Sequence, residues 1–228
     1  MAAELTEYEQ RYVDMLDELR NSPAIEMLEG KVDRVVQAYG DIPTVFEKLA
    51  RRYELTLDPS LQSRFPRFRS LSCLWQTTDE LPRLTGEFLL SHLYSQVSGG
   101  PLEIAEHFPE ESDRSLAREL RVIDDHPEGG GGFAAMRIQP HVQFPELWYF
   151  TIAHGFQLLD IGYREYFDNL LITKGVHGWQ HLFADVRLHA DEYIHARKRL
   201  TTMLQVLPEI FPGHDYEPLR ARLAQRLR

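Results

Sequence analysis

The sequence of 228 residues contains a single cysteine, Cys73. One thiol excludes an intramolecular disulfide framework and a zinc site built from cysteines. Long apolar runs are also missing, and the mean hydropathy is -0.38. Since a membrane-spanning helix needs roughly 20 consecutive apolar residues, we expect no membrane-spanning segment. The N-terminal stretch is acidic and amphipathic, unlike a secretory signal, so the sequence predicts a cytoplasmic protein.

Positive charge is scarce: 25 lysines and arginines stand against 35 aspartates and glutamates, which gives a formal net charge of -10. Nucleic-acid binding depends on a basic surface that neutralises phosphates, so this balance argues against a nucleic-acid partner. Residues 218–228 are the exception, because they carry four arginines and no acid. We interpret them as a solvated final helix whose arginines complement the helix dipole. An arm for nucleic acid or acidic lipid is the alternative.

Recognisable catalytic motifs are missing as well. There is no Gly-x-Ser-x-Gly nucleophile elbow, and Cys73 lies in an apolar segment where a buried, inert thiol is expected. The glycine run at residues 129–132 lacks the Lys-Ser/Thr of a phosphate-binding loop and follows acidic residues that repel phosphate. We interpret this run as a flexible turn between two strands, and we expect no catalytic residues and no cofactor.

Helical periodicity dominates both ends of the chain. Apolar residues recur there at spacings of three and four, and Pro23 and Gly40 stand at the ends of the first two repeats. The pattern predicts helices within residues 5–19, 25–36, 43–53, 163–171 and 182–206, the last of them closed by Pro208.

The middle of the chain has the composition of short strands. Compact apolar runs predict strands at residues 70–77, 120–123, 133–138, 147–152 and 156–161, while residues 84–97 fit either a helix or a strand. Parallel strands need crossover connections of a dozen or more residues, so the short connections favour an antiparallel meander, with Trp148 and Phe150 on one face and Tyr149 on the other. The predicted fold class is α+β, a central antiparallel sheet flanked by N-terminal and C-terminal helices.

Potential metal ligands gather in the C-terminal part, at His177, His181, Asp185, His189 and His195. On one continuous helix, His181, Asp185 and His189 would share a face and could hold a divalent metal ion. Against this, glycines stand before and after the first of these histidines, and no His-Glu-x-x-His pair occurs. We interpret these residues as surface or interface histidines. A small metal-assisted hydrolase that uses them is the alternative function.

Residues 120–186 as a whole have a familiar order. A strand ending in Val122-Ile123 precedes the glycine-rich loop, and the segment 132–138 (GFAAMRI) leads to the aromatic strand Trp148-Tyr149-Phe150. A further strand then precedes the helix 163–171, Tyr-x-x-Tyr-Phe-x-x-Leu-Leu. This order resembles the SUKH superfamily, which joins a fungal regulator of cell-wall synthesis to many bacterial immunity proteins.

The resemblance implies a division of the chain and a class of function. It places an α+β domain over residues 41–186, between helical extensions over residues 1–40 and 187–228. The family has no catalytic residues, so the resemblance implies a non-enzymatic protein-binding module, most simply an immunity-type protein that neutralises a toxin. An acidic protein suits a basic toxin domain, because opposite electrostatic fields speed encounter and fix orientation.

Four residues are the candidate contacts for such a partner. Asp124, Asp125 and Glu128 stand beside the glycine run, where they would present a mobile acidic patch. Trp179 is the candidate aromatic anchor, since tryptophan and tyrosine dominate interface hot spots. The alternative for Trp179 is a place in the hydrophobic core.

Overall fold

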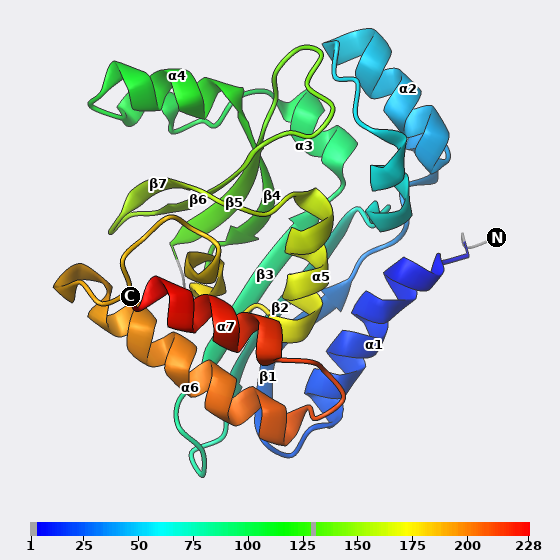
Figure 1. Ribbon diagram of the computed structural model, residues 1–228. Helices are drawn as coiled ribbons and strands as arrows, with labels where there is room; N and C mark the ends of the chain where they lie inside the picture. Colours follow the sequence, from blue (N-terminus) through cyan, green and yellow to red (C-terminus); the bar gives the residue numbers. More distant parts are fainter. Residues whose placement is uncertain (1–3, 129–130) are drawn as a thin grey trace.

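In the part of the chain that the computed structural model describes, residues 4–128 and 131–228, seven strands form one antiparallel sheet in sequence order (Figure 1). The strands are β1 (Ile25–Val32), β2 (Ser70–Thr77), β3 (Thr85–Ser91), β4 (Leu120–His126), β5 (Gly132–Arg137), β6 (Leu147–Thr151) and β7 (Gly155–Leu158). With helices at both ends of the chain, this confirms the α+β class and the antiparallel meander.

The α-helices in the same residues are α1 (Glu7–Asn21), α2 (Ile42–Tyr53), α3 (Leu93–Gly99), α4 (Glu111–Glu119), α5 (Tyr163–Thr173), α6 (Ile194–Ile210) and α7 (Glu217–Arg226). Short 3-10 turns are η1 (Gln37–Tyr39), η2 (Pro59–Arg64), η3 (Ala105–His107), η4 (Trp179–Leu182) and η5 (Asp191–Tyr193). None of the described helices is both long and apolar enough to cross a membrane.

The first predicted helix is confirmed as α1. Thr6 caps it through a capping box with Glu9, in which each side chain bonds to the other residue's backbone N–H. The apolar stripe of α1 is buried, and the Tyr12 hydroxyl donates to the carbonyl of Phe167 in α5 over 2.9 Å. This contact joins α1 to α5 on one side of the sheet.

The helix predicted over residues 25–36 is wrong, because β1 occupies most of this segment. β1 pairs antiparallel with β2, from Ile25 opposite Thr77 to Val32 opposite Leu71. A bulge between Met27 and Glu29 interrupts the period of two, so the apolar spacing imitates a helix. Val32 is 41% exposed, which shows that this spacing does not mark a buried stripe. The expected boundaries at residues 40 and 186 stay a prediction, although residues 1–40 are not wholly helical.

A close contact of the Trp75 side chain ties β2 and β3 to the residue that ends α5. In β2 every second side chain is buried, and the Trp75 indole N–H donates to the carbonyl of Lys174 over 2.7 Å. Gly86 on β3 faces this ring, since a Cβ there would lie 2.3 Å from Trp75 Nε1. The ambiguous stretch 84–97 thus divides into β3 and α3.

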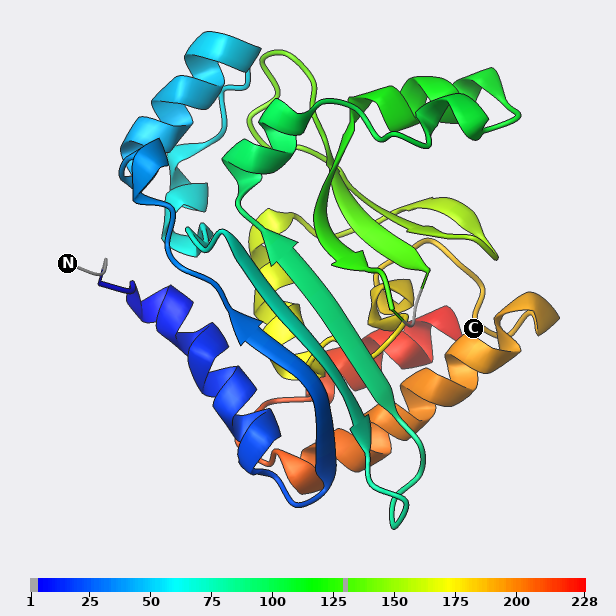
Figure 2. The same cartoon turned by 180° about the vertical axis from the view of Figure 1, so that it is seen from behind.

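The sheet has two halves that differ in what covers them. β3 and β4 pair only at Leu89 with Asp125 and at Leu90 with Asp124. Figure 2 shows β1, β2 and β3 with one face open and the helices α5, α6 and α7 behind them. The outer face of β5 and β6, which points away from the main hydrophobic core, carries a second, smaller apolar cluster that includes Trp148 and Phe150. Tyr149 lies on the opposite, inner face and belongs to the main core. The predicted alternation in β6 is therefore confirmed.

The helix predicted over residues 182–206 begins later than its sequence pattern indicates. Residues 183–193 form turns and η5, and α6 begins only at Ile194 and runs past Pro208 to Ile210. The expected helix from residue 182 and its end at Pro208 are both wrong. The final helix is confirmed as α7, and its Arg226 pairs with Asp160 over 2.7 Å and with Asp185 over 3.3 Å. These ion pairs hold the arginine-rich tail against the body of the protein.

Candidate partner-binding site

Asp124 does not belong to an exposed acidic patch, because its side chain is fully buried. Its carboxylate accepts hydrogen bonds from the Tyr166 hydroxyl at 2.7 Å and from the Leu89 backbone N–H at 3.2 Å. His126 Nε2 lies 3.4 Å from the same carboxylate. Asp124 thus connects β3, β4 and α5 at the place where β3 and β4 share only a short stretch of backbone pairing. Because its side chain is buried there, the expectation that it contacts a partner is wrong.

Trp179 is also buried, with no exposed surface, and it packs against the rings of Tyr166 at 4.8 Å and Phe183 at 5.8 Å. Its Nε1 has no hydrogen-bond partner among the described residues. The expectation of an exposed aromatic anchor is wrong, and the alternative that Trp179 packs in the core holds.

Asp125 and Glu128 remain at the surface. Asp125 is half-buried, and its carboxylate accepts from the backbone N–H of His126 over 2.9 Å. Burial, partly offset by this hydrogen bond, raises the pKa of Asp125. Glu128 is exposed, and its backbone N–H donates to the Glu87 carboxylate over 2.7 Å, which fixes the end of this segment on β3. The first two residues of the glycine run, Gly129 and Gly130, lie outside the described residues.

An apolar groove of about 420 Å³ lies against the segment 125–128. One wall comes from Ile104 and Phe108, beside η3, and the other from Phe133, Phe150 and Ile152 on or next to β5 and β6. Phe133 and Phe150 stack with ring centroids 5.0 Å apart, and Phe108 meets Phe150 edge-on at 5.5 Å. The side chain of Ile152 is open to solvent, since the residue is 83% exposed. The groove therefore offers apolar surface that nothing in the described chain covers.

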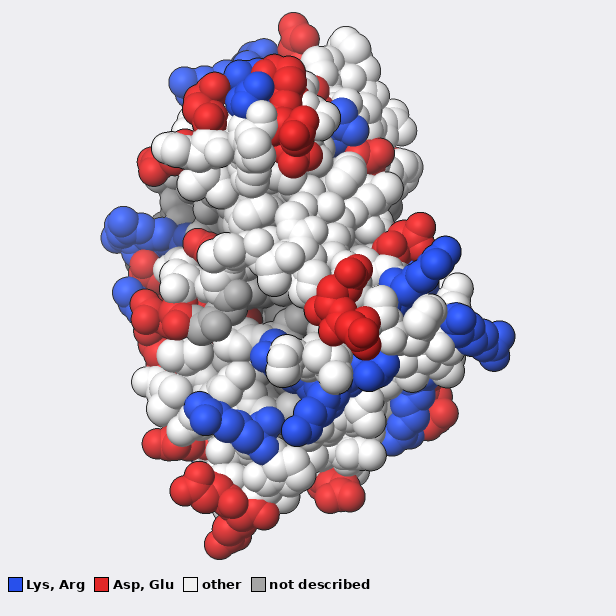
Figure 3. All heavy atoms as spheres, turned by 90° about the vertical axis from the view of Figure 1, so that its left-hand side faces the viewer, with Lys and Arg blue, Asp and Glu red and all other residues white. Residues whose placement is uncertain are grey.

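One acidic side chain, Asp125, lines the groove. Glu103 and Glu128 adjoin lining residues in the sequence, and Glu128 also lines the second recess described below. Among the described residues no lysine, arginine or histidine side chain lies within 4 Å of these three carboxylates. Figure 3, which views the side of the molecule that carries α4, β7 and α6, shows a band of uncharged atoms between charged side chains above and below it.

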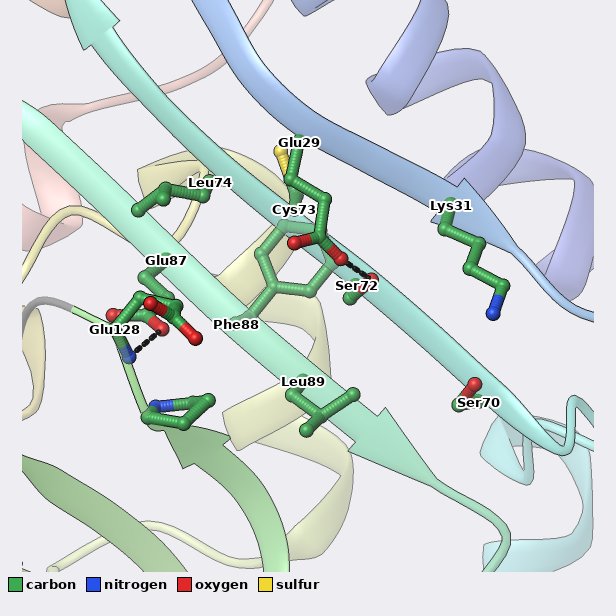
Figure 4. A pocket seen from close by; sticks show the side chains of 11 residues that line it. Glu29, Lys31, Ser70, Ser72, Cys73, Leu74, Glu87, Phe88, Leu89 and Glu128 are labelled. Carbon is green, nitrogen blue, oxygen red and sulfur yellow. Dashed lines mark hydrogen bonds between the residues drawn. The ribbon is translucent and has the colours of Figure 1, made fainter.

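A second recess, of about 280 Å³, lies on the open face of β1–β3 and shares Pro127 with the groove (Figure 4). Its surface is polar: the Ser72 hydroxyl donates to Glu29 over 3.0 Å. Cys73 borders the recess, but the thiol is buried, and burial raises its pKa to about 12. The predicted buried thiol is confirmed, and the recess offers neither a reactive group nor a large apolar contact.

The histidines expected to share one helix are dispersed. His181 is buried in η4, Asp185 is exposed and pairs with Arg226, and His189 precedes η5 in a separate turn. Over residues 4–128 and 131–228, no three His, Cys, Asp or Glu side chains come together as metal ligands would. The helical face on which the hydrolase alternative depended is not formed, and no observation favours that alternative.

The groove was not predicted from the sequence, although the sequence contained one indication of it. The alternation in β6 placed Phe150 opposite Tyr149, which implied an aromatic side chain on the outer face of the sheet. That Phe108 approaches this face from a segment 42 residues earlier in the chain depends on tertiary packing. Local periodicity carries no information about such contacts.

Comparisons of this chain with protein-family models, with curated proteins and with solved structures find no match in any of the three.

Proposed function

We propose that this protein is a non-enzymatic, immunity-type module that binds a basic protein partner, most simply a toxin domain, in the apolar groove between η3 and β6. The observation that carries the proposal is the exposed apolar wall of that groove, above all Ile152 at 83% exposure and Ile104 at 41%. Contiguous exposed apolar surface with a polar rim is typical of protein interaction sites.

The charges beside the groove support a partner of positive charge. Asp125, Glu128 and Glu103 have no cation within 4 Å among the described residues, so their charges are available to a basic surface. Such rim charges act mainly on the rate and orientation of encounter, while the apolar contacts determine how long the complex lasts. The resemblance of residues 120–186 to the SUKH superfamily, which includes immunity proteins, supports the choice of a protein partner.

The first experiment tests binding to the proteins encoded beside this chain in its genome. Tagged protein is mixed with each purified neighbour, and binding is measured by isothermal titration calorimetry. We expect Ile152→Ala to weaken the complex about tenfold or more, because full burial of one large aliphatic side chain contributes about 1.5–3 kcal/mol.

Phe144→Ala is the matched control, since Phe144 is 64% exposed and does not line the groove. It should leave the affinity within about twofold of the wild type, as surface changes away from an interface usually do. Equal losses in the two variants would contradict the assignment of the groove.

A further inference from the structure

The inner face of β6 borders a cavity that the proposed partner site does not use. The cavity has a volume of about 270 Å³ and is lined in part by Tyr149, His177, Gly178, His181 and Arg199. Tyr149 and Phe150 are neighbours on β6 and point to opposite faces, so the cavity and the apolar groove lie on opposite sides of this strand. A ligand in the cavity would therefore not compete with a partner in the groove.

The hydrogen bonds around His181 fix its tautomer. The Gln157 amide donates through Nε2 to the Tyr193 hydroxyl over 2.8 Å, which places the amide oxygen 2.9 Å from His181 Nδ1. A carbonyl oxygen only accepts, so Nδ1 carries the proton and Nε2 presents a lone pair. Burial first, then the charges of His154 and Arg199, lower the pKa of His181 to about 3. The ring is therefore neutral near pH 7.

The free nitrogen of His181 faces the cavity. The residue is only 3% exposed, yet Nε2 has no hydrogen-bond partner among the described residues. A Cβ on Gly178 would lie 3.8 Å from this atom and 3.9 Å from Arg199 Nη1. Gly178 has a φ of +78°, in the left-handed region that favours glycine. The lone pair and the guanidinium thus border the same small space beside a residue without a side chain.

Arg199 brings a positive charge to the mouth of the cavity. Its Nη1 donates to the carbonyl of His177 over 3.3 Å, and no carboxylate in the described residues lies within 4 Å of its guanidinium. An arginine fork is suited to a carboxylate, which it can bind through two parallel hydrogen bonds. The remaining N–H groups of Arg199 are available for such a ligand.

We propose that this cavity binds a small carboxylic acid that bears a hydroxyl or amino group on the neighbouring carbon. Its carboxylate pairs with Arg199, and its hydroxyl or ammonium group donates to His181 Nε2. The volume of about 270 Å³ leaves room for a small acid of this kind.

The test uses the full chain labelled with ¹⁵N-histidine and three probes of one shape: lactate, alanine and propionate. Lactate and alanine carry the donor, and propionate lacks it. We expect lactate or alanine to saturate the protein and to shift the Nε2 resonance of His181, with Nδ1 staying protonated. Propionate should bind about threefold to tenfold more weakly, the usual effect of one hydrogen bond. The proposal is overturned if neither lactate nor alanine binds. It is also overturned if all three probes and inorganic phosphate bind equally well.

Two variants separate the cavity from a general effect of charge. Arg199→Gln should abolish binding of lactate and alanine, and it should fold normally because Arg199 is exposed. Arg197→Gln removes the same charge from the same helix outside the cavity, so it should bind as the wild type does. Undiminished binding by Arg199→Gln, or equal losses in both variants, would overturn the assignment of the anion to Arg199.

Discussion

The two halves of the sheet distribute polar and apolar side chains differently. In β1–β3 the inner face buries Leu71, Cys73 and Trp75, and the open outer face carries Ser70 and Ser72. This is the usual pattern of an antiparallel sheet with one solvated face. In β4–β7 the inner face carries a buried polar network around a carboxylate, and the outer face carries phenylalanines.

The half of the sheet formed by β4–β7 has two features that reduce the stability of the fold. Burying Asp124, His126 and Gln157 has a desolvation cost that only complete hydrogen bonding offsets. Leaving Ile152 in water gives up the stabilisation that burial would provide. Both features occur in β4–β7 and its flanking turns, which is the half where we propose the interaction surface to lie.

The largest expected effect compares two adjacent acids. Asp124→Ala should lower the free energy of unfolding by about 3 kcal/mol, since it leaves the Leu89 N–H and the Tyr166 hydroxyl without an acceptor in a buried site. Asp125→Ala, on the outer face, should have a much smaller effect. Urea denaturation followed by tryptophan fluorescence measures both, and similar losses would remove the distinction between the two faces.

A second prediction concerns the first half of the sheet. Gly86→Ala should destabilise the protein by about 1–3 kcal/mol, because a methyl group 2.3 Å from Trp75 Nε1 forces the indole away from the Lys174 carbonyl. Gly99→Ala is the control, since a Cβ there meets nothing within 4 Å. It should be neutral or slightly stabilising in the same denaturation experiment. A neutral Gly86→Ala would show that β2 and β3 are not held by this contact.

The third prediction uses pH. Burial lowers the pKa of His92 and of His177 to about 4 and that of His181 to about 3, from an ordinary value of 6.5. Between pH 6.5 and these lower pKa values, the three histidines bind protons in the unfolded chain but not in the folded chain. The free energy of unfolding therefore falls as the pH falls from about 6.5 towards 4. The loss is on the order of 1–3 kcal/mol for each histidine.

A pair of variants tests whether the buried histidines cause this pH dependence. His92→Asn keeps an acceptor for the Tyr94 N–H at the start of α3 and removes one of the three titrating groups, so it should make the pH dependence shallower. His107→Gln replaces an exposed histidine and should leave the pH dependence unchanged. Stability that rises as the pH falls through this range would contradict the burial of neutral histidines.

The smallest expected effect concerns the acids beside the groove. The double change Asp125→Asn and Glu128→Gln should slow association with a basic partner severalfold at low salt and leave the dissociation rate nearly unchanged. Surface plasmon resonance at two salt concentrations separates the two rates. An effect confined to dissociation would place these carboxylates inside the contact instead of at its rim.

How much of this could be predicted from the sequence depends on whether local periodicity survives folding. β2 and β6 alternate between buried and less buried side chains, β5 is a compact apolar run, and the sequence predicted all three within a residue or two. β1 was missed because its bulge disguises the period of a strand. The opposite directions of Asp124 and Asp125 were expected, but a bulge between Val122 and Asp124 decides which of them points inward.

The candidate site was less predictable, because its residues are distant in the sequence. Acids beside a glycine run favour an exposed loop, whereas the structure inserts Asp124 between β3 and α5. Trp179 could equally have been an anchor or a core residue, and its contacts with Tyr166 and Phe183 decide for the core. These outcomes depend on tertiary contacts that local composition does not encode.

Hydrogen–deuterium exchange of the full chain with and without its partner tests the central claim most directly. If the outer face of β5 and β6 is the interaction surface, amides at residues 104–108 and 150–152 gain protection, and the open face of β1–β3 does not change. Protection confined to β1 and β2, around Glu29 and Ser72, would contradict the account and assign binding to the polar recess instead.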